Sequence, residues 1–370
     1  MDEPAVDRSV ALKILIDPSY VNFRPFHLLP RIVFSRAGWS GFRRLAQRMP
    51  GNGIGPFPRW AFGPEGFDGL DLGISYTRLL RPDLTLRERV LEGYRKARWP
   101  IYAFHATFPG GSPFFMDTAL DLGENSERTR RGLRSHIRAA AEIGGKGTLL
   151  VVHLGAANGS VETAIRNAVR LLETGLPLAQ EQEVVLALEN MPRPAGGRYY
   201  LGGDYADLKK VLAALPSPWL KVCFDWGHAN NYAGVFARLH RLRAPDAYVQ
   251  TFGYGREMIR ELGLDIVYAH VHYNRSHTEK SEKALEQGDE HMPLTRVLPA
   301  EWDAFCDTLR LLMRETSIRT FGRVNLELIP RRIFGFYPVF PRGSSLAEQL
   351  SSVKTARSIL EQERETAAPV

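Results

Sequence analysis

Residues 148–153 read TLLVVH, an apolar run that ends in histidine, and residues 184–189 read VVLALE, an apolar run that ends in glutamate. Strands that are buried on both faces have near-continuous apolar sequences like these, as in a parallel sheet with helices on its outside. Residues 161–173 and 205–215, which follow the two runs, have the apolar spacing of helices. These segments predict the alternation of strands and helices that builds parallel α/β proteins.

The same alternation extends along most of the chain. The predicted strands are 31–35, 69–73, 101–105, 148–153, 184–189, 220–225, 266–272 and 324–328. The predicted helices are 39–49, 84–98, 126–143, 161–173, 205–215, 233–262, 299–315 and 345–364. Eight strand–helix units predict an α/β protein with a single (β/α)₈ TIM barrel over residues 31–364. Residues 1–30, which hold one short apolar run at 12–16, are expected to form an N-terminal extension packed on the barrel, and residues 365–370 a frayed tail.

The composition of the 370 residues, with 44% hydrophobic and 24% charged side chains, is typical of a globular protein and excludes wholesale disorder. No apolar run approaches the ~18 residues that a membrane span needs. The acidic start, MDEP, lacks the apolar segment of a secretory signal. The two cysteines cannot form a disulfide framework and are expected to be buried free thiols. These features predict a cytoplasmic protein without membrane association.

The formal net charge is +7, and most of the 48 basic residues are arginine. A basic balance is compatible with binding nucleic acid or another anion. No run of five basic residues occurs, and arginine excess beside much alanine and glycine can also reflect genomic base composition. The charge therefore permits an anionic substrate or a nucleic acid without indicating either one, and no feature of the sequence sets the oligomeric state.

Catalytic residues of a TIM barrel lie at the carboxyl ends of its strands, and six consecutive predicted strands end in His, Asp or Glu. These candidates are His105, His153, Glu189, Asp225, His272 and Glu327, and three more follow strands six and seven, namely His228, Asp289 and His291. A buried carboxylate is costly unless a cation or a donor compensates it. Five imidazoles and four carboxylates without a thiolate suit Zn²⁺, Mn²⁺ or Fe²⁺. Nine ligands exceed the needs of one ion and fit two or three ions that share a bridging carboxylate.

Simpler explanations exist for each candidate taken alone. A carboxylate at the barrel mouth can form a salt bridge, a histidine can be a hydrogen-bonded core residue, and Asp289 and His291 can lie in a solvated loop. His270 and His272 point to the same face of their strand because side chains alternate along it. His272 is preferred as a ligand because it lies nearer the strand end, and His270 is expected to be an inner-layer or supporting residue. His27, His136, His240 and His277 lack this context and are expected to be surface or structural residues.

The strand ends resemble those of the xylose isomerase-like TIM-barrel superfamily, which includes sugar isomerases and epimerases and the endonuclease IV type of abasic-site endonuclease. The resemblance runs from about residue 32 to residue 329. The closest matches are 189–190 (EN) and 224–230 (FDWGHAN), and further matches are 105–109 (HATFP), 152–155 (VHLG), 272–274 (HYN), 289–291 (DEH) and 326–327 (LE). Residues 34–38 (FSRAG) resemble a degenerate first strand of the family.

The resemblance implies roles for all nine candidates. In endonuclease IV-like members, the positions that match His105, His153 and Glu189 hold one zinc. Those that match Glu189, Asp225, His272 and Glu327 hold a second, with Glu189 bridging, and those that match His228, Asp289 and His291 hold a third. The mononuclear isomerases need only the counterparts of Glu189, Asp225, His272 and Glu327, and there the two glutamates also act as catalytic residues in proton transfer. The presence of the other five candidates favours a trinuclear site.

Two enzyme functions follow, and the sequence departs in part from each. The leading hypothesis is a hydrolase of a phosphoester or phosphodiester with a trinuclear zinc-type site, because three divalent cations would leave the site net positive and able to activate water. The alternative is a mononuclear Mn²⁺- or Mg²⁺-dependent isomerase or epimerase of a sugar or sugar phosphate. Residues 291–296 (HMPLTR) replace the Gly-Glu-Gly element of endonuclease IV, and no counterpart of its DNA-penetrating loops is evident. A non-catalytic barrel that binds nucleic acid is a third hypothesis, which leaves the strand-end ligands unexplained.

Overall fold

The computed structural model describes residues 12–16, 62, 65–74, 79–107, 119–192, 199–239, 251–274, 291–328, 332–333, 337–338 and 343–366. Eight parallel strands close a barrel in the order β1-β10-β9-β8-β6-β4-β3-β2. Their bounds are β1 Lys13–Ile16, β2 Gly69–Gly73, β3 Ile101–His105, β4 Thr148–His153, β6 Val184–Glu189, β8 Leu220–Asp225, β9 Ile266–Val271 and β10 Arg323–Leu326. The predicted TIM barrel is confirmed.

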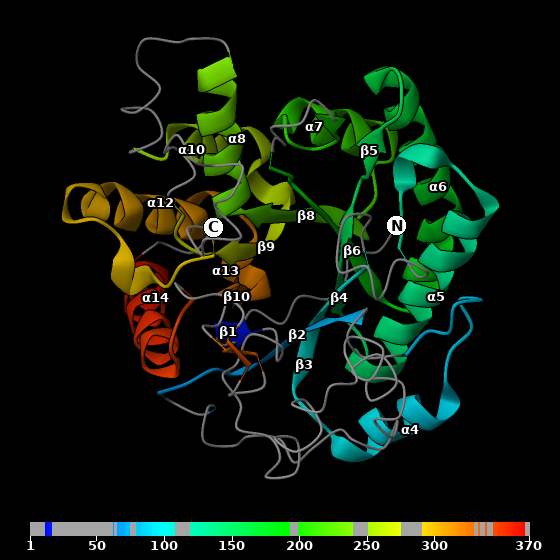
Figure 1. The fold of residues 1–370 in the computed structure, drawn as a ribbon, viewed down its shortest axis with the longest axis horizontal. Helices are drawn as coiled ribbons and strands as arrows, with labels where there is room; N and C mark the ends of the chain where they lie inside the picture. Colours follow the sequence, from blue (N-terminus) through cyan, green and yellow to red (C-terminus); the bar gives the residue numbers. More distant parts are fainter. Residues whose placement is uncertain are drawn as a thin grey trace, which may run out of the picture.

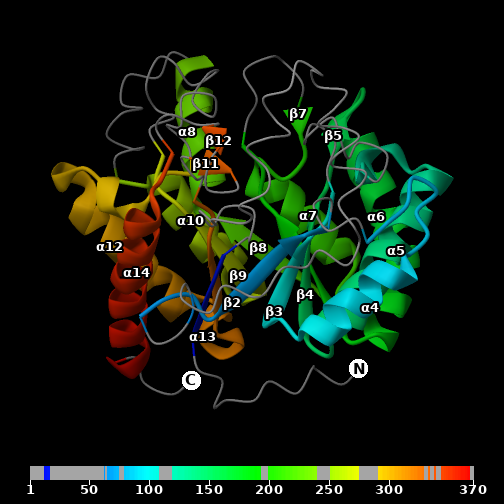
Figure 2. The same ribbon diagram turned by 60° about the horizontal axis from the view of Figure 1, so that its bottom comes forward.

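Helices surround the strands, with α5 and α6 on one side of the barrel and α12 and α14 on the other (Figures 1 and 2). The helices are α4 Glu88–Ala97, α5 Glu127–Gly144, α6 Val161–Glu181, α7 Tyr205–Ala214, α8 Trp226–Leu239, α10 Gly253–Leu262, α12 Trp302–Glu315, α13 Ile318–Phe321 and α14 Leu346–Thr366. Ser126 and Ser160 cap the first turns of α5 and α6, because each side chain accepts a hydrogen bond from the backbone three residues on. The predicted helix 233–262 is divided between α8 and α10, and residues 240–250 lie outside the described part.

Most strand residues are apolar because both faces of the strands are buried. Leu150, Leu186 and Val222 point outward into the layer between the barrel and its helices. Val151 and Ala187 point inward and pack in the barrel interior. Fully burying side chains of this size contributes about 1.5–3 kcal/mol each to folding, so the two layers together hold the ends of the strands in place.

The first strand of the barrel differs from the prediction. Residues 31–35, the predicted first strand, lie outside the described residues. The structure instead uses Lys13–Ile16 as β1, which pairs with β10 through Lys13 and Arg323 and with β2 through Leu15 and Gly69. This run had been assigned to an extension packed on the barrel, so the predicted boundary at residue 31 is wrong for these four residues. A strand of this length is too short to show a period, and Ile14 and Leu15 are both fully buried.

The structure agrees with the expectations for the two cysteines and for His136. Cys223 and Cys306 are buried free thiols. None of the helices that the structure describes is long and apolar enough to cross a membrane. The histidine His136 is structural, as expected, since it is fully buried in α5 and its Nδ1 donates to the Gly132 carbonyl at 2.8 Å. His27, His240 and His277 lie outside the described residues.

His136 should make the stability of the protein depend on pH. Burial lowers its pKa from 6.5 to about 4, so between these values the unfolded chain binds more protons than the folded one. The free energy of unfolding should therefore fall as pH falls from 6.5 to 4, by on the order of 3 kcal/mol from this group. Urea unfolding of metal-free protein at pH 6.5 and pH 4.5 measures the loss. The variant His136→Gln should lose less stability over the same interval, and an equal loss in both proteins would contradict the assignment.

Candidate metal centre

Glu189, the last residue of β6, lies at the centre of a cluster of side chains at the carboxyl ends of the strands. It is fully buried. Its Oε2 lies 2.9 Å from Nε2 of His105 and 2.6 Å from Nε2 of His153. Its Oε1 lies 3.1 Å from Nδ1 of His270 and 3.5 Å from Nδ1 of His228. Parallel pairing of β4 with β6 sets His153 level with Glu189, so these contacts follow directly from the register of the barrel.

Asp225 is the last residue of β8. The side-chain amide of Asn190, which follows β6, forms two hydrogen bonds with the backbone of Asp225. The Asn190 Oδ1 accepts from the backbone nitrogen of Asp225 at 2.6 Å, and its Nδ2 donates to the Asp225 carbonyl at 2.8 Å. Helix α8 begins at the next residue, so Asp225 Oδ1 accepts from the backbone nitrogen of His228 at 2.6 Å and the His228 ring faces the mouth. The same Oδ1 lies 3.2 Å from Nε2 of His272.

A backbone bridge brings His291 beside His272, although the two residues are 19 positions apart in the chain. Tyr273 and Met292 exchange two backbone hydrogen bonds of 3.0 and 2.7 Å. The rings of His272 and His291 stack with their centroids 4.0 Å apart, and Nδ1 of His291 lies 3.7 Å from Oε2 of Glu327. The structure thus gathers eight of the nine predicted site residues, and the ninth, Asp289, lies outside the described residues.

His270, which was expected to be an inner-layer or supporting residue, lies inside the cluster together with the preferred ligand His272. The Nδ1 of His270 lies 3.1 Å from Oε1 of Glu189, 3.3 Å from Oε2 of Glu327 and 3.7 Å from Oδ2 of Asp225. His272 stays a candidate, because its Nε2 lies 3.2 Å from Oδ1 of Asp225 and its Nδ1 is buried without a hydrogen-bond partner in the described part of the chain. The pairing of β8 with β9 sets His270 level with Asp225.

Asp71 is a second residue that the sequence interpretation missed. It lies in the middle of β2, is 1% exposed, and its Oδ2 is 3.2 Å from Nε2 of His270. The signal was present in the sequence, because an aspartate stands in the centre of an otherwise apolar five-residue strand (GLDLG). Asp71 lies in the middle of its strand, whereas the predicted site residues lie at or after strand ends.

The electrostatics of the cluster keep its carboxylates ionised. Burial opposes the charged form of Glu189, but His270, His153 and His105 outweigh it and hold the pKa of Glu189 well below its usual range. Burial likewise opposes ionisation of Glu327, yet His291 and His270 lower its pKa to about 2.

The imidazoles divide into two kinds. Burial disfavours the charged form of His105, but the Glu189 carboxylate raises its pKa to about 9. Burial and the neighbouring His272 lower the pKa of His291 to about 4, so its ring is neutral at pH 7. Protons on rings such as His105 balance the buried carboxylates in the absence of a cation, and a cation that took their place would release them.

The donor set fits divalent metal ions. The structure brings together three groups of ligand atoms that lie within 4.8 Å of one another: His105, Glu189 and His270; Glu189, Asp225, His270 and Glu327; and His272, His291 and Glu327. Asp225 Oδ2 and Glu327 Oε2 have no hydrogen-bond donor among the residues described. Buried carboxylate oxygens of this kind need a compensating charge, and nitrogen and oxygen ligands suit Zn²⁺, Mn²⁺ or Fe²⁺.

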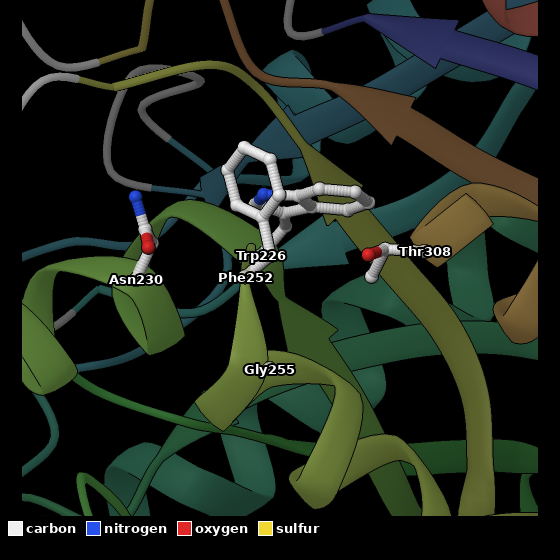
Figure 3. A pocket seen from close by; sticks show the side chains of 5 residues that line it. All are labelled: Trp226, Asn230, Phe252, Gly255 and Thr308. Carbon is white, nitrogen blue, oxygen red and sulfur yellow. The ribbon is translucent and has the colours of Figure 1, made fainter. Parts of the chain in front are cut away.

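A small pocket behind the centre is lined by Trp226, Asn230, Phe252, Gly255 and Thr308 (Figure 3). The indole of Trp226 packs against Phe252 with ring centroids 5.1 Å apart and against Phe305 at 4.7 Å. The three rings come from the first residue of α8, the N-cap of α10 and the first turn of α12. Trp226 therefore anchors the start of α8, and with it the ring of His228.

The closed barrel and the cluster of His, Asp and Glu side chains at the carboxyl ends of its strands can be compared with known protein families. The model of the family described as the xylose isomerase-like TIM barrel matches residues 65–312. The chain belongs to this family, as the resemblance of its strand ends implied. A search of the curated proteins found no match.

Solved structures with the same fold share little sequence with this chain. A D-tagatose 3-epimerase-like protein is 18% identical, with a TM-score of 0.52 over 96% of this chain and 100% of that chain. The D-allulose 3-epimerase from Methylomonas sp. in complex with D-allulose is 11% identical, with a TM-score of 0.52 over 96% and 100% of the two chains. The IolI protein with a bound zinc atom is 11% identical, with a TM-score of 0.51 over 95% and 99%.

Proposed function

We propose that the protein is a metal-dependent epimerase or isomerase that acts on a sugar or a sugar phosphate. The observation that carries this proposal is the quartet of Glu189, Asp225, His270 and Glu327, whose candidate ligand atoms lie within 4.8 Å of one another. Three carboxylates and one imidazole suit a hard divalent ion such as Mn²⁺ or Mg²⁺, and Zn²⁺ as well. Sugar epimerases among the solved structures of the same fold support this choice.

The quartet provides the two proton-transfer groups that such a reaction needs. Glu189 and Glu327 come from β6 and β10, which are separated in the barrel by β8 and β9. Both are ionised, so one can take a proton from the carbon beside a carbonyl while the other faces the substrate from another side. A divalent cation in the quartet would polarise that carbonyl. Inversion would require the second glutamate to gain a proton from solvent and deliver it to the opposite face of the carbon, while the first glutamate later releases to solvent the proton that it took. Return of the proton by the first glutamate to the neighbouring carbon, with transfer of the hydroxyl proton to the carbonyl oxygen, would move the carbonyl.

A hydrolase of phosphoesters with several metal ions is a second candidate. The favouring observation is the group of His272, His291 and Glu327 beside the quartet, together with His105 and His153 on Glu189. These imidazoles exceed what one ion requires. Extra cations would make the mouth net positive and suited to a phosphate, which is the arrangement first expected from the nine candidates.

Metal content and solvent exchange together test the proposed function. Protein stripped with a chelator and reloaded with Mn²⁺, Co²⁺ or Zn²⁺ is incubated in D₂O with a panel of ketohexoses and ketose phosphates. We expect deuterium to enter the carbon beside the carbonyl, as followed by NMR, and the stripped protein to be inactive. A phosphodiester such as bis(p-nitrophenyl) phosphate serves as the parallel substrate. Hydrolysis of this ester with about three ions per chain, and no exchange into any ketose, would reject the epimerase in favour of the second candidate.

A further inference from the structure

We propose that Asn190 and Asn274 are positioning residues that hold the turn between β8 and α8 from its two sides, so that Asp225 is in place before a metal ion binds. The inference rests on the metal centre of the proposed function. It assigns a role to two amide side chains that are 0% and 2% exposed and that no step of the proposed reaction uses.

The turn between β8 and α8 contains no loop residue. Strand β8 ends at Asp225 and helix α8 begins at Trp226, so the chain changes from extended to helical geometry within one residue. The carboxylate of Asp225 caps the new helix, because its Oδ1 accepts from the backbone nitrogen of His228 at 2.6 Å. This bond leaves Oδ2 to face a cation, and Oδ2 is buried without a hydrogen-bond donor among the described residues.

Asn190 extends the pairing of β6 with β8 past the end of the backbone ladder. The last residue pair of that ladder is Glu189 with Cys223. Beyond it, Oδ1 of Asn190 accepts from the backbone nitrogen of Asp225 at 2.6 Å, and Nδ2 donates to the Asp225 carbonyl at 2.8 Å. An amide side chain both accepts and donates, so it satisfies both backbone groups, whereas a carboxylate could satisfy only the nitrogen.

Asn274 holds the same turn from the side of β9. Its Nδ2 donates to the Gly227 carbonyl at 2.5 Å, and its Oδ1 accepts from Nδ2 of Asn230 in α8 at 3.0 Å. Asn274 follows His272 by two residues, and the turn packs directly on that ring, since a Cβ at Gly227 would lie 1.7 Å from its Cε1. The turn is therefore tied both to the strand end that carries Glu189 and to the segment that carries His272.

Hydrogen bonds within the protein thus define the position of Asp225. Because these bonds form on folding, the entropy cost of ordering the turn is met before an ion binds and does not weaken its binding. Side chains that support metal ligands in this way typically change the metal affinity by about 10- to 100-fold when they are removed. A purely structural role of the two asparagines predicts a loss of stability alone, whereas a positioning role predicts a loss of metal affinity as well.

Titration of stripped protein with Co²⁺, followed by its visible absorption spectrum, tests the inference. We expect Asn190→Ala and Asn274→Ala each to raise the Kd for Co²⁺ by about 10- to 100-fold and to change the spectrum. Asn167→Ala is the matched control, because Nδ2 of Asn167 in α6 also donates to a backbone carbonyl, that of Gly123, at 2.8 Å. Urea unfolding should show reduced stability in all three variants, but the control should keep the Kd and the spectrum of the wild type. An unchanged Kd and spectrum in either of the other variants would overturn the inference for that asparagine, and an equal loss of affinity in the control would overturn it for both.

Hydrogen exchange in the wild-type protein decides the matter if Asn190→Ala does not fold. The backbone amide of Asp225 donates to Asn190, and that of His228 donates to Asp225. We expect both amides to exchange in stripped protein about as slowly as the amide of Leu186, which donates to the Trp219 carbonyl in the barrel. Protection that arises only after Co²⁺ is added would mean that the ion orders the turn, contrary to the inference.

The titration also separates failure of this inference from failure of the proposed function. If the wild type binds no Co²⁺, the metal centre fails and both proposals fall. If the wild type and Asn167→Ala bind the ion and the variants of Asn190 and Asn274 bind it as tightly, the metal centre stands and only the role of the two asparagines is wrong.

Discussion

Glu189→Gln is expected to abolish activity and to remove metal from the protein. Four imidazoles, those of His105, His153, His228 and His270, lie within 3.5 Å of the two oxygens of Glu189. A glutamine keeps the shape but loses the charge, and its NH₂ group would point a donor where a ligand atom is needed. Loss of the proton-transfer group alone reduces the rate by roughly 10²- to 10⁴-fold. Metal analysis of purified protein and the exchange assay in D₂O measure the two losses.

Glu261→Gln is the matched control for this substitution. Glu261 pairs with Lys209 at 2.7 Å on the surface, and both side chains are more than 40% exposed. Surface pairs of this kind contribute about 0–1 kcal/mol, so the control should keep its metal and its rate. Thermal unfolding of both variants in the presence of a chelator shows whether the fold is intact. A Glu189→Gln protein that retains the metal content and the rate of the wild type would refute the central role of this residue.

Gly227→Ala is expected to destabilise the protein and to displace His272. A Cβ atom at residue 227 would lie 1.7 Å from Cε1 and 2.2 Å from Nε2 of His272. The ring has no room to move, because it is 1% exposed and stacked on His291. Alanine is better than glycine inside a helix by about 1 kcal/mol, so the change would otherwise stabilise α8. Overpacking of a buried site costs about 1–3 kcal/mol, and the overlap here reverses the sign.

Gly255→Ala provides the comparison for Gly227→Ala, since Gly255 lies in α10 and lines the small pocket of Figure 3. A Cβ there would meet Phe224 at 3.5 Å and Ala229 at 3.7 Å, which are ordinary contacts. We expect this variant to be as stable as the wild type or more so. Urea unfolding of the metal-free proteins measures both changes. Equal stability of the two variants would show that the ring of His272 can move aside.

The sequence predicted the barrel and most of the cluster because both depend on a local signal. Apolar runs such as 184–189 identify strands buried on two faces, and the residue that ends each run must lie at the mouth once the strands are parallel. The contacts of His270 with Glu189 and Asp225 could not be predicted, because they depend on how β9 pairs with β8, which no single apolar run reveals. The contacts of Asp71 could not be predicted for a related reason. Its partners Tyr268 and Asn325 are 197 and 254 residues away in the chain.

The choice between the two enzyme functions shows a second limit of the sequence. Counting ligands such as His105, His153 and His291 favoured a trinuclear site, because nine candidates exceed the needs of one ion. Counting does not say which side chains share an ion. The structure places candidate ligand atoms of Glu189, Asp225, His270 and Glu327 within 4.8 Å of one another, and those of His272, His291 and Glu327 form a second such group.

The short strand β1 has a consequence for the order in which the protein can be assembled. It closes the barrel by pairing Lys13 with Arg323, so the seam joins the first and the last of the barrel strands in chain order. Until β10 leaves the ribosome, the nascent sheet keeps two open edges, and unpaired edges are templates for unwanted association. The barrel can therefore close only after β10 has been translated. A chaperone that shields the two open edges would act before the barrel closes.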